Sequence, residues 1–139
     1  MIQQVLSWKN LEAAWRQVEA NKSAPGVDRV TVQRWARNWE TNLNRLLTQV
    51  RTNTYCPNRP RRYKVAKGDG TYRELSILTV TDRVMQRAVL NVLGEVFEKK
   101  FLNCSFGYRP NRSVANAVTA VVRNRERGLR CVFDADITR

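Results

Sequence analysis

The strongest constraint on the fold of this chain is a change in the spacing of its apolar residues. Up to Val50, and again from Val84, apolar residues recur every three or four positions, which is the period of a helix packed along one face. Between these regions, alternating apolar residues flank a Gly68-Asp69-Gly70 turn, which predicts a β-hairpin over residues 62–78. The sequence therefore predicts an α+β fold with one hairpin carried by helices.

Four helices are predicted from this periodicity and from residues that favour helix caps. They cover residues 8–21, 32–50 (cap Thr31), 82–102 (cap Thr81 or Asp82) and 114–127 (cap Ser113, closed by Gly128). The second helix is expected to be continuous, because its apolar residues form one unbroken stripe. The stripe consists of Val32, Trp35, Trp39, Leu43, Leu46, Leu47 and Val50. This spacing favours a helix–helix core over a surface for stacking bases.

The segment Arg130–Ile137 alternates and is rich in β-forming residues, which predicts a strand. A single strand cannot satisfy its backbone groups without neighbours. Four helices and one hairpin are unusual partners for it, so we expect the chain to be the N-terminal part of a longer protein.

The charge balance is the clearest indication of a partner. Lysine and arginine number 25 against 12 acidic residues, which gives a net charge of +13. Such an excess favours a polyanionic partner, with nucleic acid first and a solvated basic surface as the alternative. The cations are spread along the chain rather than on one amphipathic helix, which disfavours a membrane surface. No apolar run reaches the roughly 20 residues that span a bilayer, and no secretory signal is present, so a cytoplasmic location is expected.

The chain has no histidine, which excludes Ser-His-Asp and Cys-His catalysis and histidine-bound zinc. Cys56, Cys104 and Cys131 are odd in number and far apart, so neither a disulfide framework nor a zinc site is predicted. Buried or free thiols in a reducing compartment are expected.

Two groups of residues could carry chemistry. Around the predicted hairpin lie many cations, which are suited to a triphosphate or a template backbone. They are Arg59, Arg61, Arg62, Lys64, Lys67, Arg73 and Arg83. Asp134 and Asp136 would share one face of the last strand, where magnesium could relieve their repulsion. A solvated basic hairpin and two solvated acids remain the alternatives, because this spacing alone does not decide between them.

Several ordered motifs resemble the fingers region of group II intron-type reverse transcriptases and their bacterial, retron-like relatives. They are Ala24–Asp28; Lys67, Gly70 and Arg73; the Asp82-Arg83-Val84-Met85-Gln86 helix motif; Glu95–Phe101; Ser105–Ser113; and Asp134–Ile137, which is similar to the opening of polymerase motif A. The resemblance implies fingers over residues 1–129, including an N-terminal extension over about 1–55. It implies the first strand of the palm over 130–139.

The resemblance also implies roles for single residues. Lys67 and Arg73 would bind the triphosphate of the incoming nucleotide. Asp136 would be the catalytic, metal-binding aspartate, with Ile137 and Asp134 as further ligands of Mg²⁺ in the longer protein. Nucleic-acid contacts are expected from Gly26, Arg61, Arg62, Lys64, Arg83, Gln86, Gly107, Arg109 and Arg112. For the 82–86 helix motif, internal pairing of Asp82 and Arg83 is the alternative.

The sequence departs from the family in two ways. After Arg73 the family reads proline-leucine-glycine-isoleucine-proline, whereas this chain reads Glu74-Leu75-Ser76-Ile77-Leu78. The YxDD motif is absent, so we expect the parent to be an RNA-directed DNA polymerase and this chain to bind nucleic acid without polymerising. A non-catalytic module for structured RNA in splicing or particle assembly is the alternative, and a purely structural piece is a third. Expected partners are template or intron RNA, with DNA primer and dNTP in the parent; a second copy of the chain is another candidate.

Overall fold

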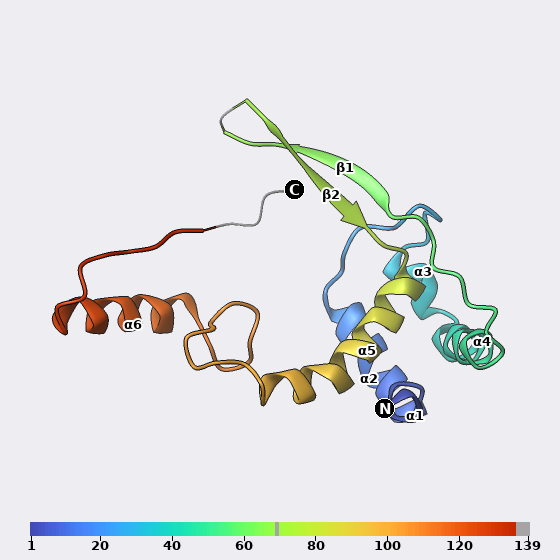
Figure 1. Cartoon of the computed structure of the whole chain (residues 1–139). Helices are drawn as coiled ribbons and strands as arrows, with labels where there is room; N and C mark the ends of the chain where they lie inside the picture. Colours follow the sequence, from blue (N-terminus) through green and yellow to red (C-terminus); the bar gives the residue numbers. More distant parts are fainter. Residues whose placement is uncertain (69, 136–139) are drawn as a thin grey trace. The chain divides into compact units, whose positions relative to one another are not determined.

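The computed structural model describes residues 1–68 and 70–135 (Figure 1). In chain order the elements are α1 (Ile2–Val5), α2 (Trp8–Ala20), α3 (Val32–Ala36), α4 (Trp39–Arg51), β1 (Arg61–Ala66), β2 (Tyr72–Ile77), α5 (Val80–Glu98) and α6 (Val114–Glu126). This combination of helices with an antiparallel hairpin agrees with the predicted α+β class. The chain divides into two compact units, residues 1–95 and the residues from Val96 onward.

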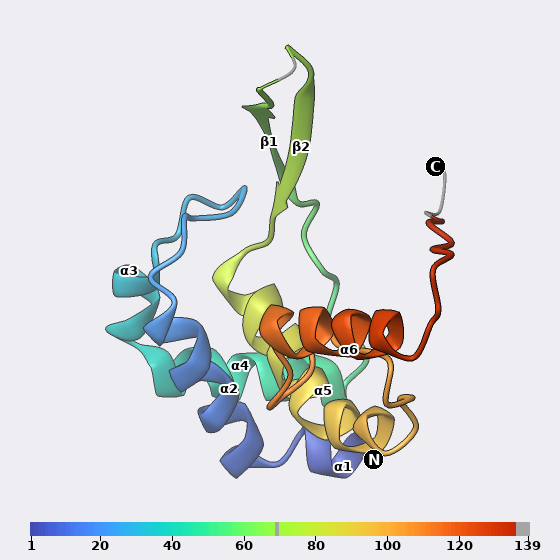
Figure 2. The same ribbon diagram turned by 90° about the vertical axis from the view of Figure 1, so that its left-hand side faces the viewer.

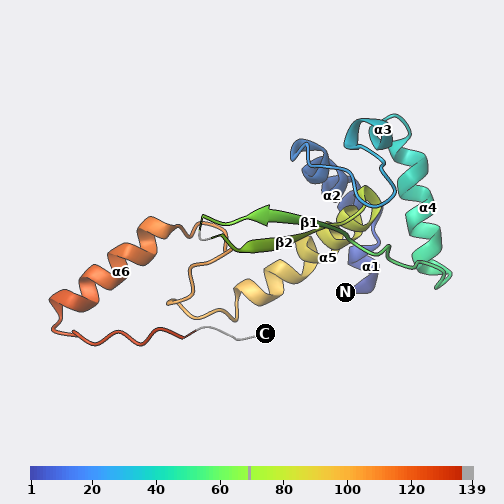
Figure 3. The same ribbon diagram turned by 90° about the horizontal axis from the view of Figure 1, so that it is seen from above.

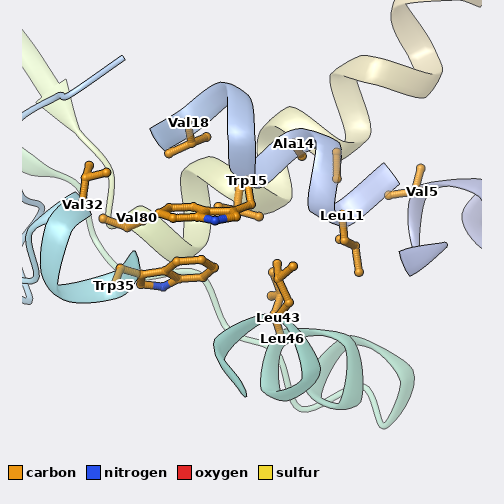
Figure 4. Packing of buried hydrophobic residues seen from close by; sticks show 12 residues of the cluster. Val5, Leu11, Ala14, Trp15, Val18, Val32, Trp35, Leu43, Leu46 and Val80 are labelled. Atoms are coloured by element: carbon orange, nitrogen blue, oxygen red, sulfur yellow. The ribbon is translucent and has the colours of Figure 1, made fainter. Parts of the chain in front are cut away.

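The core of the first unit is built around two tryptophans (Figure 4). Trp15 on α2 is fully buried, and its ring lies 4.3 Å from that of Trp35 on α3, measured between ring centroids. The indole N–H of Trp35 donates a hydrogen bond to Thr81 Oγ1 on α5 at 3.1 Å. Around them pack Val5, Leu11, Ala14, Val18, Val32, Leu43, Leu46, Val80, Val84 and Ala88. The prediction that Trp35 serves a core rather than base stacking is thus confirmed.

The predicted helix over 32–50 is wrong in its continuity. Thr31 caps its first part as expected, since its hydroxyl accepts from the Arg34 N–H at 3.1 Å. The helix then breaks at Asn38, which has φ −131° and ψ 38°. Across the break, the side chain of Asn42 donates to the carbonyl of Trp35 at 3.1 Å. The apolar stripe is therefore divided between two helices, α3 and α4. The chain changes direction between them to pack both on the core, and the spacing of apolar residues does not encode this change.

The hairpin forms where the alternation predicted it. Arg61 pairs with Ile77 at its base and Ala66 with Tyr72 near its tip. The Lys67 N–H donates to the carbonyl of Thr71 at 2.7 Å, and Gly70 has a positive φ of 79°, which glycine adopts without strain. Figure 2 shows the hairpin extending away from α2, α3 and α4, and Figure 3 shows its strands side by side from above.

Helix α5 begins two residues before the predicted start. Its first turn is capped by Thr79, whose hydroxyl accepts from the Asp82 N–H at 3.2 Å, rather than by Thr81 or Asp82. Val80, Val84 and Ala88 face the core of the first unit.

The second unit is more open than the sequence predicted. Ser113 and Asn116 form a capping box at the start of α6, and Gly128 lies beyond its end with φ 88°. No residue of α6 is buried, however, so its valines form an exposed stripe rather than a packed one. The predicted strand is absent over residues 130–135, which have no regular secondary structure. A strand needs a neighbouring strand for its backbone hydrogen bonds, and in the described residues only β1 and β2 pair.

All three cysteines are free and exposed. None of the helices in the described part of the chain is long and apolar enough to cross a membrane.

Candidate nucleic-acid interface

The register of the hairpin gives its two faces different chemistry. Directly paired residues point to the same side, and neighbours along a strand point to opposite sides. One face therefore carries the pairs Arg61–Ile77, Tyr63–Leu75 and Val65–Arg73. The other carries Arg62–Ser76, Lys64–Glu74 and Ala66–Tyr72. Each face thus carries two cations: the first combines its arginines with apolar residues, and the second combines Arg62 and Lys64 with Glu74.

Five positive side chains, here called the hairpin cations, are available to a ligand. They are Arg61, Arg62, Lys64, Lys67 and Arg73, and all are exposed. Arg62 approaches Glu74 at 3.9 Å, but with 78% and 48% of the two side chains exposed this pair is weak. Among the described residues, no carboxylate lies within salt-bridge distance of the other four. The turn brings Lys67 to the same end of the hairpin as Arg73.

The base of the hairpin is tied to α5 by one buried carboxylate. Asp82 is 5% exposed and accepts three hydrogen bonds from other residues. Tyr55 donates its hydroxyl to Oδ1 at 2.6 Å, while the Asn58 N–H at 3.2 Å and the Thr79 hydroxyl at 2.6 Å donate to Oδ2. Burial, and secondarily the bond to Asp82, raise the pKa of the Tyr55 phenol above its ordinary value.

The next residue of α5 holds the loop that contains the Ala24–Asp28 motif, residues 22–30. The guanidinium of Arg83 donates to the Ser23 hydroxyl, to the Ala24 carbonyl at 3.0 Å, and more weakly to the Thr79 carbonyl at 3.4 Å. Asp82 and Arg83 do not pair with each other. Each instead binds groups of other segments within the protein, so the alternative of internal pairing holds with different partners: Tyr55, Asn58 and Thr79 for Asp82, and Ser23, Ala24 and Thr79 for Arg83. Gln86, one turn further on, is exposed.

Gly26 lies where loop 22–30 meets the start of α5. A Cβ at this position would come within 2.7 Å of the Thr79 backbone N and Cα and within 2.9 Å of the Leu78 carbonyl carbon. Because these are backbone atoms, neither neighbour can move aside by a rotamer change. The structure thus gives Gly26 a packing role, whether or not it also contacts nucleic acid.

Gly26→Ala is expected to destabilise the first unit by about 1–3 kcal/mol, the usual cost of overpacking. Gly68→Ala is the matched control in the same unit, since a Cβ there would meet nothing within 4 Å, and it should change stability by less than about 0.5 kcal/mol. Urea unfolding of the two variants measures the difference. Equal stability of both variants would contradict the close approach of loop 22–30 to α5.

In the second unit, Arg109 is anchored inside the protein. Its side chain is only 5% exposed and pairs with Glu98 at 2.7 Å. It also donates to the carbonyls of Leu102 at 2.7 Å and Ser105 at 2.9 Å, and its guanidinium lies over the ring of Phe101. The hydrogen bond from Arg109 lowers the pKa of Glu98. We therefore leave Arg109 out of the proposed interface, because its donors already hold the loop after α5.

The remaining predicted contacts of this unit are on the surface. Gly107 is exposed. Arg112 is half-buried, donates to the backbone and side-chain oxygens of Asn103 at 3.3 Å, and lies over the Phe106 ring. The spacing of the Glu95–Phe101 and Ser105–Ser113 motifs does not predict that Glu98 of the first pairs with Arg109 of the second.

The predicted metal ligands are only partly within the described residues. Asp134 is exposed in the irregular segment 129–135, whereas Asp136 and Ile137 lie outside the described residues. Within residues 1–68 and 70–135, no three acidic or cysteine side chains gather in a way that could hold a metal ion. Asp134 alone supplies one carboxylate of the hard oxygen type that magnesium prefers.

No family model matches the chain. It is 34% identical over 97 residues to protein YkfC of Escherichia coli (strain K12), an alignment that covers 70% of this chain and 26% of the relative. It is 33% identical over 85 residues to the group II intron-encoded protein LtrA of Lactococcus lactis subsp. cremoris, covering 60% and 14%. It is 29% identical over 76 residues to a putative COX1/OXI3 intron 2 protein of Saccharomyces cerevisiae (strain ATCC 204508 / S288c), covering 55% and 9%.

The chain is thus similar to intron-encoded proteins, one of which is encoded by a group II intron. The alignments span about a quarter or less of the length of each relative.

Proposed function

We propose that the chain binds RNA through its basic hairpin, as the fingers part of a reverse transcriptase of the group II intron type. The observation that carries this proposal is the exposed hairpin with its five cations. Among the described residues, four of these cations have no carboxylate partner. The net charge of +13 and the intron-encoded relatives support it. Phosphate neutralisation on such a ribbon supplies affinity without sequence preference.

The finer proposal concerns the parent activity, RNA-directed DNA synthesis from a DNA primer. Lys67 and Arg73, at the tip of the hairpin, would bind the triphosphate of an incoming dNTP. Asp136, with Asp134 and the Ile137 carbonyl, would hold Mg²⁺, which supplies charge stabilisation for phosphoryl transfer when bound. Because the chain lacks the YxDD aspartates, we propose that it binds nucleic acid but does not extend a primer by itself.

Equilibrium binding of the full chain to a single-stranded RNA, followed by fluorescence anisotropy at several salt concentrations, tests the main proposal. Affinity should fall steeply with salt, by about 0.7 in log K per log unit of salt for each phosphate neutralised. No binding at low salt, or an affinity independent of salt, would end the proposal. In parallel, a primer-extension assay with Mg²⁺ should give no product, and synthesis would contradict the second part.

A non-catalytic role in binding structured RNA is the second candidate, favoured by the intron-encoded relatives. In that case, a folded intron RNA should bind more tightly than a single strand of the same length at the same salt concentration. Equal affinity for both RNAs would favour the template-binding role.

A further inference from the structure

We infer that Asp82 and Arg83 are positioning residues that fix the hairpin and loop 22–30 on α5, so that nucleic-acid binding depends on them although neither needs to touch the ligand. Their effect on binding rests on the proposed function, whereas their effect on the hairpin does not. Both residues belong to the 82–86 helix motif, in which Arg83 and Gln86 were expected to contact nucleic acid.

Asp82 ties down both ends of the hairpin. Asn58 lies three residues before β1, and Thr79 lies two residues after β2. The Oδ2 atom of Asp82 accepts from both of them, at 3.2 Å from the Asn58 N–H and 2.6 Å from the Thr79 hydroxyl. In each of these bonds, and in the bond from Tyr55, the oxygen of Asp82 is the acceptor. One buried side chain thus determines where the two strands leave the helical part of the unit.

The hairpin has little else to hold it there. All residues of β1 are exposed, and in β2 only Ile77 is half-buried. Two strands without a covered face are marginally stable by themselves. The orientation of the hairpin on the first unit therefore depends on the contacts at its base. A substitution at Asp82 should therefore make the position of the whole hairpin less fixed. All five hairpin cations would then be affected together, rather than the RNA contact of one of them.

Arg83 acts in the same way on loop 22–30. It donates to Ser23 and to the Ala24 carbonyl, while Gly26 lies close against the backbone of Thr79. Its guanidinium is therefore engaged with the loop rather than free for a phosphate. The adjacent residues 82 and 83 accordingly set the positions of two separate segments on one helix end.

The test compares Asp82→Asn with Asn10→Ala in the full chain. Asparagine offers one acceptor oxygen in place of two, so its NH₂ group must face either the Tyr55 hydroxyl or the Asn58 N–H and the Thr79 hydroxyl, and the three bonds that Asp82 accepts cannot all persist. Any bond that remains is weaker, because a neutral amide oxygen replaces a carboxylate oxygen. Asn10 is the matched control because its side chain also bridges segments of the first unit, donating to the carbonyls of Val5 at 3.0 Å and Ala88 at 2.9 Å. It makes no bond to the hairpin or to loop 22–30.

The first readout is independent of RNA. Hydrogen exchange of the Asn58 amide and of the paired amides of β1 and β2 should become faster by about tenfold or more in Asp82→Asn, and should be unchanged in Asn10→Ala. Unchanged exchange in a folded Asp82→Asn variant would overturn the inference, even if the chain never binds RNA.

The second readout is RNA binding by the folded protein. Asp82→Asn should weaken binding by about tenfold or more and make its dependence on salt shallower, because fewer phosphates are neutralised. A merely destabilising change such as Asn10→Ala lowers the active fraction but leaves the salt slope of the folded protein intact. Wild-type affinity and slope in Asp82→Asn would also overturn the inference, whereas failure of the wild type to bind would end the proposed function alone.

If Asp82→Asn does not fold, Tyr55→Phe and Ser23→Ala carry the test. Each removes one donor or acceptor of the junction and leaves the core of the first unit in place. Tyr55→Phe should speed exchange of the Asn58 amide, and Ser23→Ala should speed exchange in loop 22–30, by about twofold to tenfold each. Unchanged exchange in both variants would overturn the inference.

Discussion

Trp15→Ala is expected to destabilise the first unit by about 3–5 kcal/mol, which is a large fraction of the stability of a unit of this size. The indole is fully buried, lies 4.3 Å from the Trp35 ring, and is surrounded by residues of α2, α3, α4 and α5. Its removal leaves a cavity where four helices meet, and none of them can close it without moving the others. Urea unfolding followed by circular dichroism measures the loss.

Trp8→Ala is the matched control, because Trp8 begins the same helix but is 38% exposed. It should cost less than half as much, since less apolar surface leaves water when this side chain packs. Similar losses in the two variants would mean that the core does not centre on Trp15. If the Trp15→Ala protein is already unfolded without urea, this result also agrees with the expected loss of stability.

Neutralising the five hairpin cations together to glutamine is expected to reduce RNA binding by orders of magnitude. Each cation neutralises about one phosphate, so the salt dependence should become shallower by up to about 3.5 in log K per log unit on single-stranded RNA. The loss should be similar for different RNA sequences, because these contacts read the backbone and not the bases. Anisotropy titrations at several salt concentrations measure both the affinity and the slope.

The control changes five exposed cations away from the hairpin, so that both variants lose the same amount of the net charge of +13. These are Lys9, Arg34, Arg37, Arg45 and Arg51. If binding depended only on overall charge, the two variants would lose affinity equally. A larger loss and a shallower slope in the hairpin variant alone would show that the ribbon is the contact surface, and equal losses would contradict it.

The local features of this protein were predictable from the sequence because their causes are local. Alternation around Gly70 gives the hairpin, three-and-four spacing gives α2, and Ser113 caps α6 through bonds to residues only three positions away. The expectation that Trp35 packs in a core also held, because an apolar stripe on an otherwise polar helix has few other uses.

Other features depend on partners that are distant in the sequence. Three features depend on which surfaces pack together in the folded chain, and the spacing of apolar residues does not encode this. They are the break at Asn38, the exposure of the α6 valines and the absence of a strand over residues 130–135.

For the candidate site too, some features could be predicted from the sequence and others depended on tertiary structure. Composition and motifs alone located the hairpin cations, since a basic ribbon needs only local pairing to form. The roles of Asp82, Arg83 and Arg109 were decided by tertiary structure, because each binds atoms brought to it by the fold. A charged side chain becomes a ligand contact or an internal anchor according to whether the fold offers it partners away from water, and only three-dimensional packing determines that.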